Sequence, residues 1–326
     1  MRDKEMNGYV LGIDGGGTKT VVTAADLNGS VLDSFCSGAI NINGESQDNV
    51  RNNLKYIFMN SGSRFGGMKA CKSVCIGTAG VSNTEARLFI ENTSREAGYS
   101  GPLHITGDHL AALYGALGRP AGIILIAGTG SICYGKNEAG EEHRTGGFGY
   151  LIDDEGSGYA IGRDILSAVV RAYDGRREKT LLTPLVLDQL GVSTIEEIIS
   201  FLYDKDLNKR DIAALAPNLA TAYTAGDRAA CKIVEKCCDE LFKLACPVVE
   251  RLGLDSCELA MAGSILQKDD NICSGFTARI ASRYPGIKCR FPGKDASYGA
   301  VLMALERLSL IPSSPSSCSE APLTAL

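Results

Sequence analysis

Short runs of apolar residues recur along the chain, and several of them end at a glycine. Such runs, bounded by turn residues, are typical of buried β-strands. Glycine fits the tight turn that follows because it has no side chain and tolerates unusual backbone angles. Four strands of this kind are predicted, over Val10–Asp14, Val74–Ile76, Ile123–Ala127 and Leu259–Ala262.

One arrangement of strands and turns occurs twice. A strand, a glycine loop, a second strand and a polar turn appear first around Gly15–Gly17 and again around Gly128–Gly130. The two loops begin 113 residues apart, which is the size of a domain. We therefore predict a duplicated α/β domain. The boundaries are placed at residues 1–118 and 119–296, with a hinge near Leu117–Pro120.

Between the predicted strands, apolar residues recur at helical spacing, which predicts helices there. Val50, Leu54 and Ile57 have this spacing, and Asn83 or Thr84 can cap a helix that stops at Gly98. Pro247 predicts a kink or a break in the long amphipathic segment 227–253. A last helix, near residues 297–310, is expected to pack back on the first domain. The Ser/Pro-rich tail, residues 311–326, is predicted to be disordered.

Composition narrows the class of protein. Glycine makes up 38 of 326 residues, about 12% against a typical ~7%. The net charge is −5, and Lys and Arg are scattered without the basic stripe of a nucleic-acid-binding protein. The first apolar run, Tyr9–Ile13, is too short for a signal peptide, and no run is long enough for a membrane span. We expect a cytoplasmic protein with no nucleic-acid or membrane partner.

The chain contains 12 cysteines but no C-x-x-C motif. Zinc ribbons and thioredoxin-type sites usually need that spacing. Cys231, Cys238 and Cys246 fall roughly on one face of a helix, which favours buried, small apolar residues. The alternatives are that the protein comes from an oxygen-sensitive organism or that a cysteine is a ligand of a cluster shared between chains.

The two glycine loops are candidates for phosphate binding, because a turn after a strand exposes several backbone N–H groups together. Neither loop has the Gly-Lys-Ser/Thr ending of a P-loop, and Gly15–Gly17 leads into a strand, unlike a dinucleotide fingerprint. Asp14 precedes the first loop. Its carboxylate either holds Mg²⁺ or caps the turn.

Two further acidic positions have a structural and a functional interpretation. Asp108, after Ile105–Gly107, is either a helix N-cap or a general base for an attacking hydroxyl. The segment Gly146–Gly158 combines glycines with Asp153, Asp154 and Glu155. It is either a solvated acidic loop or a site whose carboxylates accept hydrogen bonds from sugar hydroxyls.

Together these motifs resemble the N-acetylglucosamine kinase branch of the BadF/BadG/BcrA/BcrD ATPase family, within the actin, sugar kinase and Hsp70 superfamily. Their order and spacing cover roughly residues 8–310. The resemblance implies two ribonuclease-H-like (actin-like ATPase) α/β domains that face a central cleft. It also implies a homodimer, because dimers are usual among such relatives. The motifs are Ile13–Thr20, Thr106–Asp108, Ala127–Ser131, Gly147–Gly149 and Asp154–Ser157.

The resemblance implies roles for individual residues. Two phosphate loops for ATP are expected at Gly15, Gly16, Gly17, Thr18 and Lys19 and at Gly128, Thr129, Gly130 and Ser131. Asp14 is expected to bind Mg²⁺, Asp108 to act as the catalytic base, Gly263 and Ser264 to form the adenosine turn, and Ala213 to line the adenine. The expected sugar-site positions are Asn41, Thr78, Asp108, Gly147, Phe148, Gly149, Asp154 and Gly158.

Two positions depart from the family pattern and bear on sugar specificity. Phe148 stands where relatives usually have Trp, and Asp153 where they usually have Gly. The expected reaction is ATP-dependent phosphorylation of the 6-hydroxyl of N-acetylglucosamine. Glucosamine, N-acetylmannosamine and N-acetylmuramic acid stay open as substrates. The main alternative is an ATPase that activates a dehydratase or reductase through an interface iron–sulfur cluster, and a third is a sugar-sensing regulator.

Overall fold

A computed structural model describes residues 7–42, 44–81, 83–205 and 207–310. The tail predicted to be disordered, residues 311–326, lies outside the described residues. The chain divides into two compact units. The first contains the residues up to Tyr114 together with the segment from Ala296, and the second is Gly115–Asp295.

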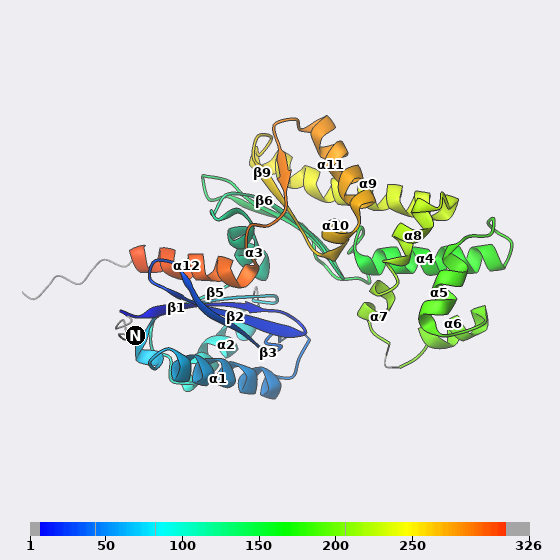
Figure 1. The fold of residues 1–326 in the computed structure, drawn as a ribbon. Coiled ribbons are helices and arrows are strands. Elements are labelled where there is room, and N and C mark those ends of the chain that lie inside the picture. The colour runs from blue at the N-terminus through cyan, green and yellow to red at the C-terminus, as the bar shows by residue number, and fades with distance from the viewer. Residues whose placement is uncertain (1–6, 43, 82, 206, 311–326) are drawn as a thin grey trace, which may run out of the picture. The chain divides into compact units, whose positions relative to one another are not determined.

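The first unit is built around a mixed sheet of five strands (Figure 1). β1 pairs antiparallel with β2 and parallel with β4, and β4 pairs parallel with β5. The carboxyl ends of β1, β4 and β5 therefore meet at one edge of the sheet. In spatial order the strands are β3 (Val31–Gly38), β2 (Lys19–Asp26), β1 (Tyr9–Gly15), β4 (Cys71–Thr78) and β5 (Leu103–Thr106).

Helices cover both faces of this sheet, because alternate side chains of a strand point to opposite faces. Leu11 and Ile13 lie in one buried cluster with Leu54 of α1, whereas Val10 lies in another with Val301 of α12. Figure 1 shows α1 and α2 on the face opposite α12. The helices are α1 (Gln47–Arg64), the short 3₁₀ turn η1 (Met68–Ala70), α2 (Thr84–Glu96), α3 (Asp108–Leu117) and α12 (Ala296–Leu310).

Helix α12 approaches the centre of β1 closely. A side chain at Gly12 would overlap the carbonyl oxygen of Ser297, so this strand position must be glycine. The buried hydroxyls of Thr23 and Ser297 are hydrogen-bonded at 2.7 Å. The last described helix is thereby part of the core of the first unit.

The second unit repeats the strand order of the first. β6 pairs antiparallel with β7 and parallel with β9, as β1 does with β2 and β4. The predicted duplication of an α/β domain is confirmed. In spatial order its strands are β10 (Lys288–Arg290), β9 (Glu258–Ala262), β6 (Gly122–Ala127), β7 (Ser131–Lys136) and β8 (Glu142–Gly146).

A larger set of helices surrounds the second sheet. α9 is continuous through Pro247, so the break considered at this residue is absent. Asp227 caps its start by accepting from the N–H groups of Ala229 and Ala230, and Gly253 ends it in the left-handed conformation. The helices are α4 (Gly158–Tyr173), α5 (Leu182–Leu190), α6 (Ile195–Leu202), α7 (Lys209–Ala213), α8 (Asn218–Thr224), α9 (Arg228–Leu252), α10 (Ser264–Lys268) and α11 (Asp270–Arg283).

The entry and exit of the chain at the second unit are hydrogen-bonded to each other. The Gly115 carbonyl accepts from the N–H of Lys294, and the Ala116 carbonyl accepts from the N–H of Gly293, both at 3.0 Å. A side chain at Gly115 would overlap the carbonyl oxygen of Asp295. The backbone segment that enters the second unit and the segment that leaves it are therefore in direct contact.

Five of the eleven described cysteines are buried in the cores. Burial raises the pKa of Cys71 and of Cys75 to about 12, so both thiols stay protonated at neutral pH. Of the three predicted to share a helix face, Cys238 is buried, Cys246 is half-buried and Cys231 is exposed. The prediction that these three cysteines are buried therefore holds for Cys238, in part for Cys246 and not for Cys231.

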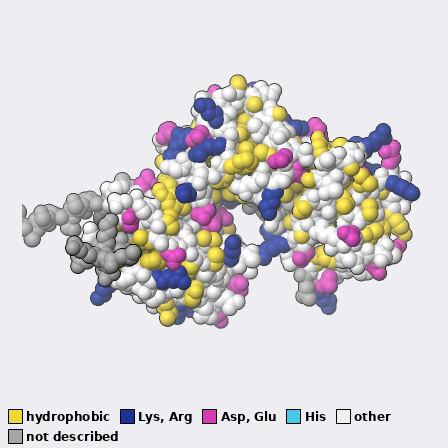
Figure 2. All heavy atoms as spheres, in the orientation of Figure 1, with side chains coloured by type: hydrophobic (Ala, Val, Ile, Leu, Met, Phe, Trp, Pro, Cys, Tyr) yellow, Lys and Arg dark blue, Asp and Glu magenta, His cyan; other side chains and the backbone are white. Residues whose placement is uncertain are grey.

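No helix in the described part of the chain is both long and apolar enough to cross a membrane. Acidic and basic side chains are intermingled on the face seen in Figure 2.

Candidate functional site

The ends of β1 and β4 are joined by a buried hydrogen bond. Thr78 is fully buried, and its hydroxyl donates to the Gly15 carbonyl at 2.8 Å. A side chain at Gly15 would lie 2.5 Å from Ile40 Cγ1 and 2.9 Å from Thr78 Cβ, so only glycine fits. This packing fixes the position at which the first glycine loop begins.

The first glycine loop is short and open. The Gly16 N–H donates to the Lys19 carbonyl at 3.1 Å, and Gly17, Thr18 and Lys19 are exposed. A Cβ at Gly17 would lie 3.8 Å from Asn41 Nδ2, so the Asn41 amide lies beside the loop. The structure brings these predicted residues together.

Two carboxylates lie at the same edge of the first sheet. Asp14 is half-buried and opposite Gly77 in the β1–β4 register. A Cβ at Gly77 would lie 3.7 Å from Asp108 Cα, which places the start of α3 over this strand end. Asp108 Oδ1 accepts from the N–H of His109 at 2.9 Å and lies 3.4 Å from its Nδ1. The Asp108 side chain is 48% exposed, so it can receive a substrate hydroxyl.

The second glycine loop is seated on the start of α4. The Gly158 N–H donates to the Gly128 carbonyl at 2.7 Å, and the Tyr159 N–H donates to the Thr129 carbonyl at 3.3 Å. Within the loop, the Gly128 N–H donates to the Gly130 carbonyl at 2.9 Å. These bonds hold the loop in one shape at the end of β6.

Asp154 packs against this second loop. It is 3% exposed and has a φ of 64°, and its Oδ1 accepts from the Ser131 N–H at 3.2 Å. Burial raises the pKa of the Asp154 carboxyl above its usual range, and the hydrogen bond from Ser131 only partly offsets this. The Ser131 hydroxyl donates to the Glu155 carbonyl at 2.7 Å. A predicted sugar-site residue is therefore in direct contact with a predicted phosphate loop.

The segment before Asp154 forms a separate exposed turn. Gly147 and Gly149 have φ values of 73° and 97°. Between them Phe148 is 63% exposed, and the Arg144 guanidinium lies 4.7 Å from its ring centroid. The Phe148 N–H donates to Asp153 Oδ2 at 3.1 Å. The two residues that depart from the family pattern thus contact each other.

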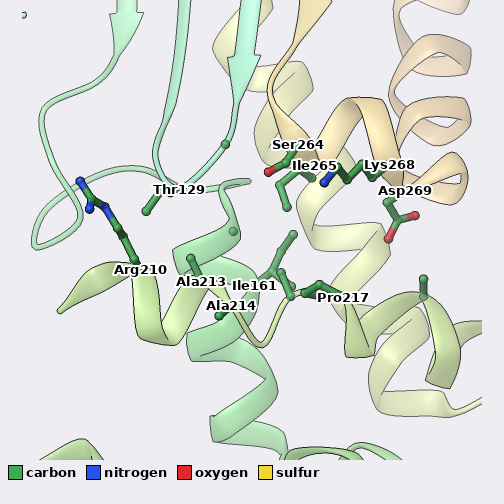
Figure 3. A pocket seen from close by; sticks show the side chains of 14 residues that line it. Thr129, Ile161, Arg210, Ala213, Ala214, Pro217, Ser264, Ile265, Lys268 and Asp269 are labelled. Atoms are coloured by element: carbon green, nitrogen blue, oxygen red, sulfur yellow. The ribbon is translucent and has the colours of Figure 1, made fainter. Parts of the chain in front are cut away.

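A cavity of about 400 Å³ lies within the second unit, in the volume range of small-molecule sites. Figure 3 shows small apolar side chains along its middle, Thr129 and Arg210 at one end, and Ser264, Lys268 and Asp269 at the other. Its lining includes four of the residues predicted to bind ATP, namely Gly128, Thr129, Ala213 and Ser264. Gly158, predicted as a sugar-site position, lines it as well.

Glycines let the segments around this cavity pack closely against one another. A Cβ at Gly158 would lie 3.1 Å from the Gly128 carbonyl oxygen and 3.4 Å from Ala213 Cβ. At Gly162, one turn later, a Cβ would overlap the Ile212 carbonyl oxygen and lie 2.8 Å from the Ile212 carbonyl carbon. Sequence reasoning missed Gly162. Its spacing of four from Gly158, which puts both on one helix face, could have indicated a close helix contact.

The predicted adenosine turn has a similar constraint. Gly263 caps α10 with a φ of 89°, and a side chain there would overlap the Ala127 carbonyl oxygen. Close contact between the ends of β6 and β9 therefore aims Ser264 into the cavity. Other lining residues that the sequence did not indicate are Ile161, Arg210, Ala214, Ala216, Pro217, Ala220, Ile265, Lys268 and Asp269.

The cavity can accept a flat, largely apolar group with an anion beside it. Ala213, Ala214 and Pro217 form an apolar wall, and the loop at Gly128 and Thr129 supplies backbone at one end. A glycine turn of this kind favours anionic oxygens.

Two α/β units with the same strand order, each with a glycine loop after its first strand, define an actin-like ATPase fold. A solved structure from Chromobacterium violaceum with a provisional N-acetylglucosamine kinase assignment has this fold. It aligns with a TM-score of 0.71 at 24% identity, over 91% of this chain and 99% of that one.

The chain belongs to the BadF/BadG/BcrA/BcrD ATPase family, whose sequence pattern matches residues 11–304. The resemblance inferred from the motifs is confirmed. Membership of an ATPase family implies the use of ATP.

Two relatives match nearly the whole chain. The N-acetylmuramic acid/N-acetylglucosamine kinase of Clostridium acetobutylicum is 36% identical, over 91% of this chain and 98% of the relative. The N-acetyl-D-glucosamine kinase of Dictyostelium discoideum is 32% identical, over 90% of this chain and 97% of the relative.

Proposed function

We propose that this protein is an ATP-dependent amino-sugar kinase that phosphorylates the 6-hydroxyl of N-acetylglucosamine or a close relative such as N-acetylmuramic acid. The support is the similarity to two kinases with these substrates in their names, over at least 90% of the chain. Both matches also cover at least 97% of the relative, so neither is confined to a shared nucleotide-binding segment.

The observation that carries the ATP half of the proposal is the cavity of the second unit. Its apolar wall at Ala213 and Pro217 suits the adenine ring, and its serine turn at Ser264 suits the ribose. The loop from Gly128 to Ser131 then takes the phosphates. We assign Gly158 to this nucleotide pocket and not to the sugar site, since it lies between Gly128 and Ala213.

The observation that supports the sugar half is the open carboxylate at the edge of the first sheet. One carboxylate oxygen of Asp108 accepts a hydrogen bond from the His109 N–H. The side chain is half exposed, so a bulky substrate can reach this base. In the proposed role Asp108 orients the 6-hydroxyl and takes its proton during attack. Asn41, beside the same strand ends, is proposed to contact the sugar. Thr78 is fully buried and bonded to the Gly15 carbonyl, so we propose that it supports the site through this strand end and does not touch the sugar.

Asp154 and the Gly147–Gly149 turn are the sugar-binding positions that we propose for the second unit. Since Asp154 also contacts Ser131, a sugar hydroxyl bound to this carboxylate would be coupled to the phosphate loop. Phe148, with Arg144 against its ring, is proposed to shape the part of the site that selects among amino sugars.

Asp14 is the proposed Mg²⁺ residue. Mg²⁺ prefers oxygen ligands and is commonly held by one or two carboxylates together with substrate phosphates. A half-buried carboxylate next to a phosphate loop fits this donor set. Among the described residues there is no group of three His, Cys, Asp or Glu side chains that could hold a metal without the nucleotide. When bound, Mg²⁺ would neutralise charge on the phosphates.

Replacing Asp108 with asparagine tests the proposed base. Asparagine keeps an oxygen that can accept from the His109 N–H but cannot take a proton. General bases contribute about 10²–10⁴-fold to the rate, so kcat should fall by that factor while ATP affinity stays within about twofold. Asp48→Asn, at the exposed first turn of α1, is the matched control and should be fully active. Near-normal turnover by Asp108→Asn would contradict the role.

Two expectations drawn from the sequence stay predictions. A homodimer is testable by light scattering on the purified protein. The alternative of an ATPase that activates a partner enzyme predicts ADP release that does not depend on sugar.

A further inference from the structure

A second cavity, of about 300 Å³, lies on the other side of α4 from the nucleotide pocket's glycines and is lined by α4, the segment after it, and α9. Its floor is apolar, from Ala168, Ala229 and Ile233, and its rim is charged. The volume is at the lower end of the range for small-molecule sites. A ligand here would be the size of a single small metabolite.

The rim carries four cations and one carboxylate. The lining contains Arg171, Arg177, Lys232 and Lys236 and one acidic residue, Asp164, which is a formal excess of three positive charges among the lining residues. Within the described part of the chain, Arg171, Arg177 and Lys232 form no ion pair, whereas Lys236 Nζ contacts Asp164 Oδ2 at 2.7 Å. Like charges held around one concave surface attract an anion.

We infer that this cavity is a binding site for a small phosphate monoester, distinct from the nucleotide pocket and the sugar site. Two guanidinium groups match the paired oxygens of a phosphate, and lysine adds a point charge. The apolar floor of Ala168, Ala229 and Ile233 offers a surface for the carbon skeleton that inorganic phosphate lacks. The ester should therefore bind more tightly than inorganic phosphate.

Lys236 links this cavity to the second glycine loop. Besides Asp164 it contacts Glu155 Oε2 at 3.4 Å, and that oxygen is buried without a hydrogen bond. The Glu155 carbonyl in turn accepts from the Ser131 hydroxyl. An anion that draws Lys236 toward the cavity would leave Glu155 with Arg163, 2.7 Å from its Oε1, as the ion-pair partner among the described residues, and would loosen the loop. The bound ester should therefore lower the affinity for ATP, and by linkage ATP should lower the affinity for the ester.

Titration calorimetry with N-acetylglucosamine 6-phosphate and, separately, inorganic phosphate tests the site. The variant is the double substitution Arg171→Gln/Lys232→Gln. The control is Lys243→Gln/Arg251→Gln, which removes the same charges from an exposed part of α9 outside the cavity. We expect the cavity variant to weaken ester binding at least tenfold and the control less than twofold. All four side chains are at the surface, so both proteins should fold normally.

Two results would overturn the inference. One is the absence of saturable ester binding to the wild-type protein at millimolar concentration. The other is equal ester affinity in the wild type and the cavity variant, which would place the ester elsewhere. Inorganic phosphate binding as tightly as the ester would refute the contribution of the apolar floor. An ATP affinity unchanged by the ester would refute the link through Lys236. These measurements read binding and do not depend on kinase turnover.

Discussion

Replacing Gly162 with alanine tests the packing that shapes the proposed nucleotide pocket. The added Cβ would overlap the Ile212 carbonyl oxygen and lie 2.8 Å from its carbonyl carbon. Carbon atoms pack at about 3.5–4.0 Å, so α7 would have to move by about 1 Å. Overpacking of this kind costs about 1–3 kcal/mol. Alanine in a helix returns about 0.5–1 kcal/mol relative to glycine, which leaves a net loss of about 0–2.5 kcal/mol; we expect the upper part of this range, because the overlap is with backbone atoms.

The same movement should weaken ATP binding. Ala213, which lines the pocket, directly follows Ile212, and α7 is only five residues long, so it shifts more easily than α4. A displaced wall should raise the Kd for a non-hydrolysable ATP analogue by about tenfold, or about 1.4 kcal/mol. Calorimetry measures the Kd, and urea unfolding measures the stability.

Gly62→Ala, in α1 of the first unit, is the matched control. Its Cβ would lie 3.3 Å from the flexible Met68 side chain, so stability should be unchanged or higher and ATP binding unchanged. If Gly162→Ala lost stability but bound ATP as the wild type does, this cavity would not be the nucleotide pocket. If neither property changed, the α4–α7 packing described above would be wrong.

Two further predictions concern the strand ends and the acidic loop. Thr78→Val removes the buried hydroxyl that donates to the Gly15 carbonyl. The free energy of unfolding in urea should fall by about 1–2 kcal/mol, and sugar phosphorylation should be slower. A variant of wild-type stability would contradict the role of this hydrogen bond. Burial raises the pKa of Asp154, so the folded state holds that proton more tightly than the unfolded state, and the ionised carboxylate destabilises the fold above the ordinary Asp pKa of about 3.9. Asp154→Asn should therefore be more stable than the wild type at pH ~7 and lose this advantage below pH ~4. A stability gain that did not vary with pH would contradict the assigned cause.

The sequence predicted the ends of the central strands well, because short local patterns mark them. An apolar run followed by glycines needs only its own residues to be recognised, and Gly15 and Gly128 were found in this way. Their repetition at a domain-sized interval indicated the duplicated fold. Asp108 was found for the same reason, since it sits where a strand gives way to a helix.

Contacts between distant segments could not be predicted in this way. A glycine inside α4 looks only like a weak helix position until Ile212, fifty residues away, packs against it. Asp154 was predicted from the resemblance to bind sugar, but its burial against Ser131 depends on a loop that folds back over the strand end. The basic cavity combines α4 with α9, and no local pattern relates Arg171 to Lys232.

The most direct test of the central claim is a coupled assay of ADP release with N-acetylglucosamine, N-acetylmuramic acid, glucosamine, N-acetylmannosamine and no sugar, followed by ³¹P NMR of the product. The proposed function predicts ADP release that depends on at least one of these amino sugars and a phosphate on its 6-oxygen, both abolished in Asp108→Asn. ADP release at the same rate without sugar, or a product phosphorylated at another position, would contradict it.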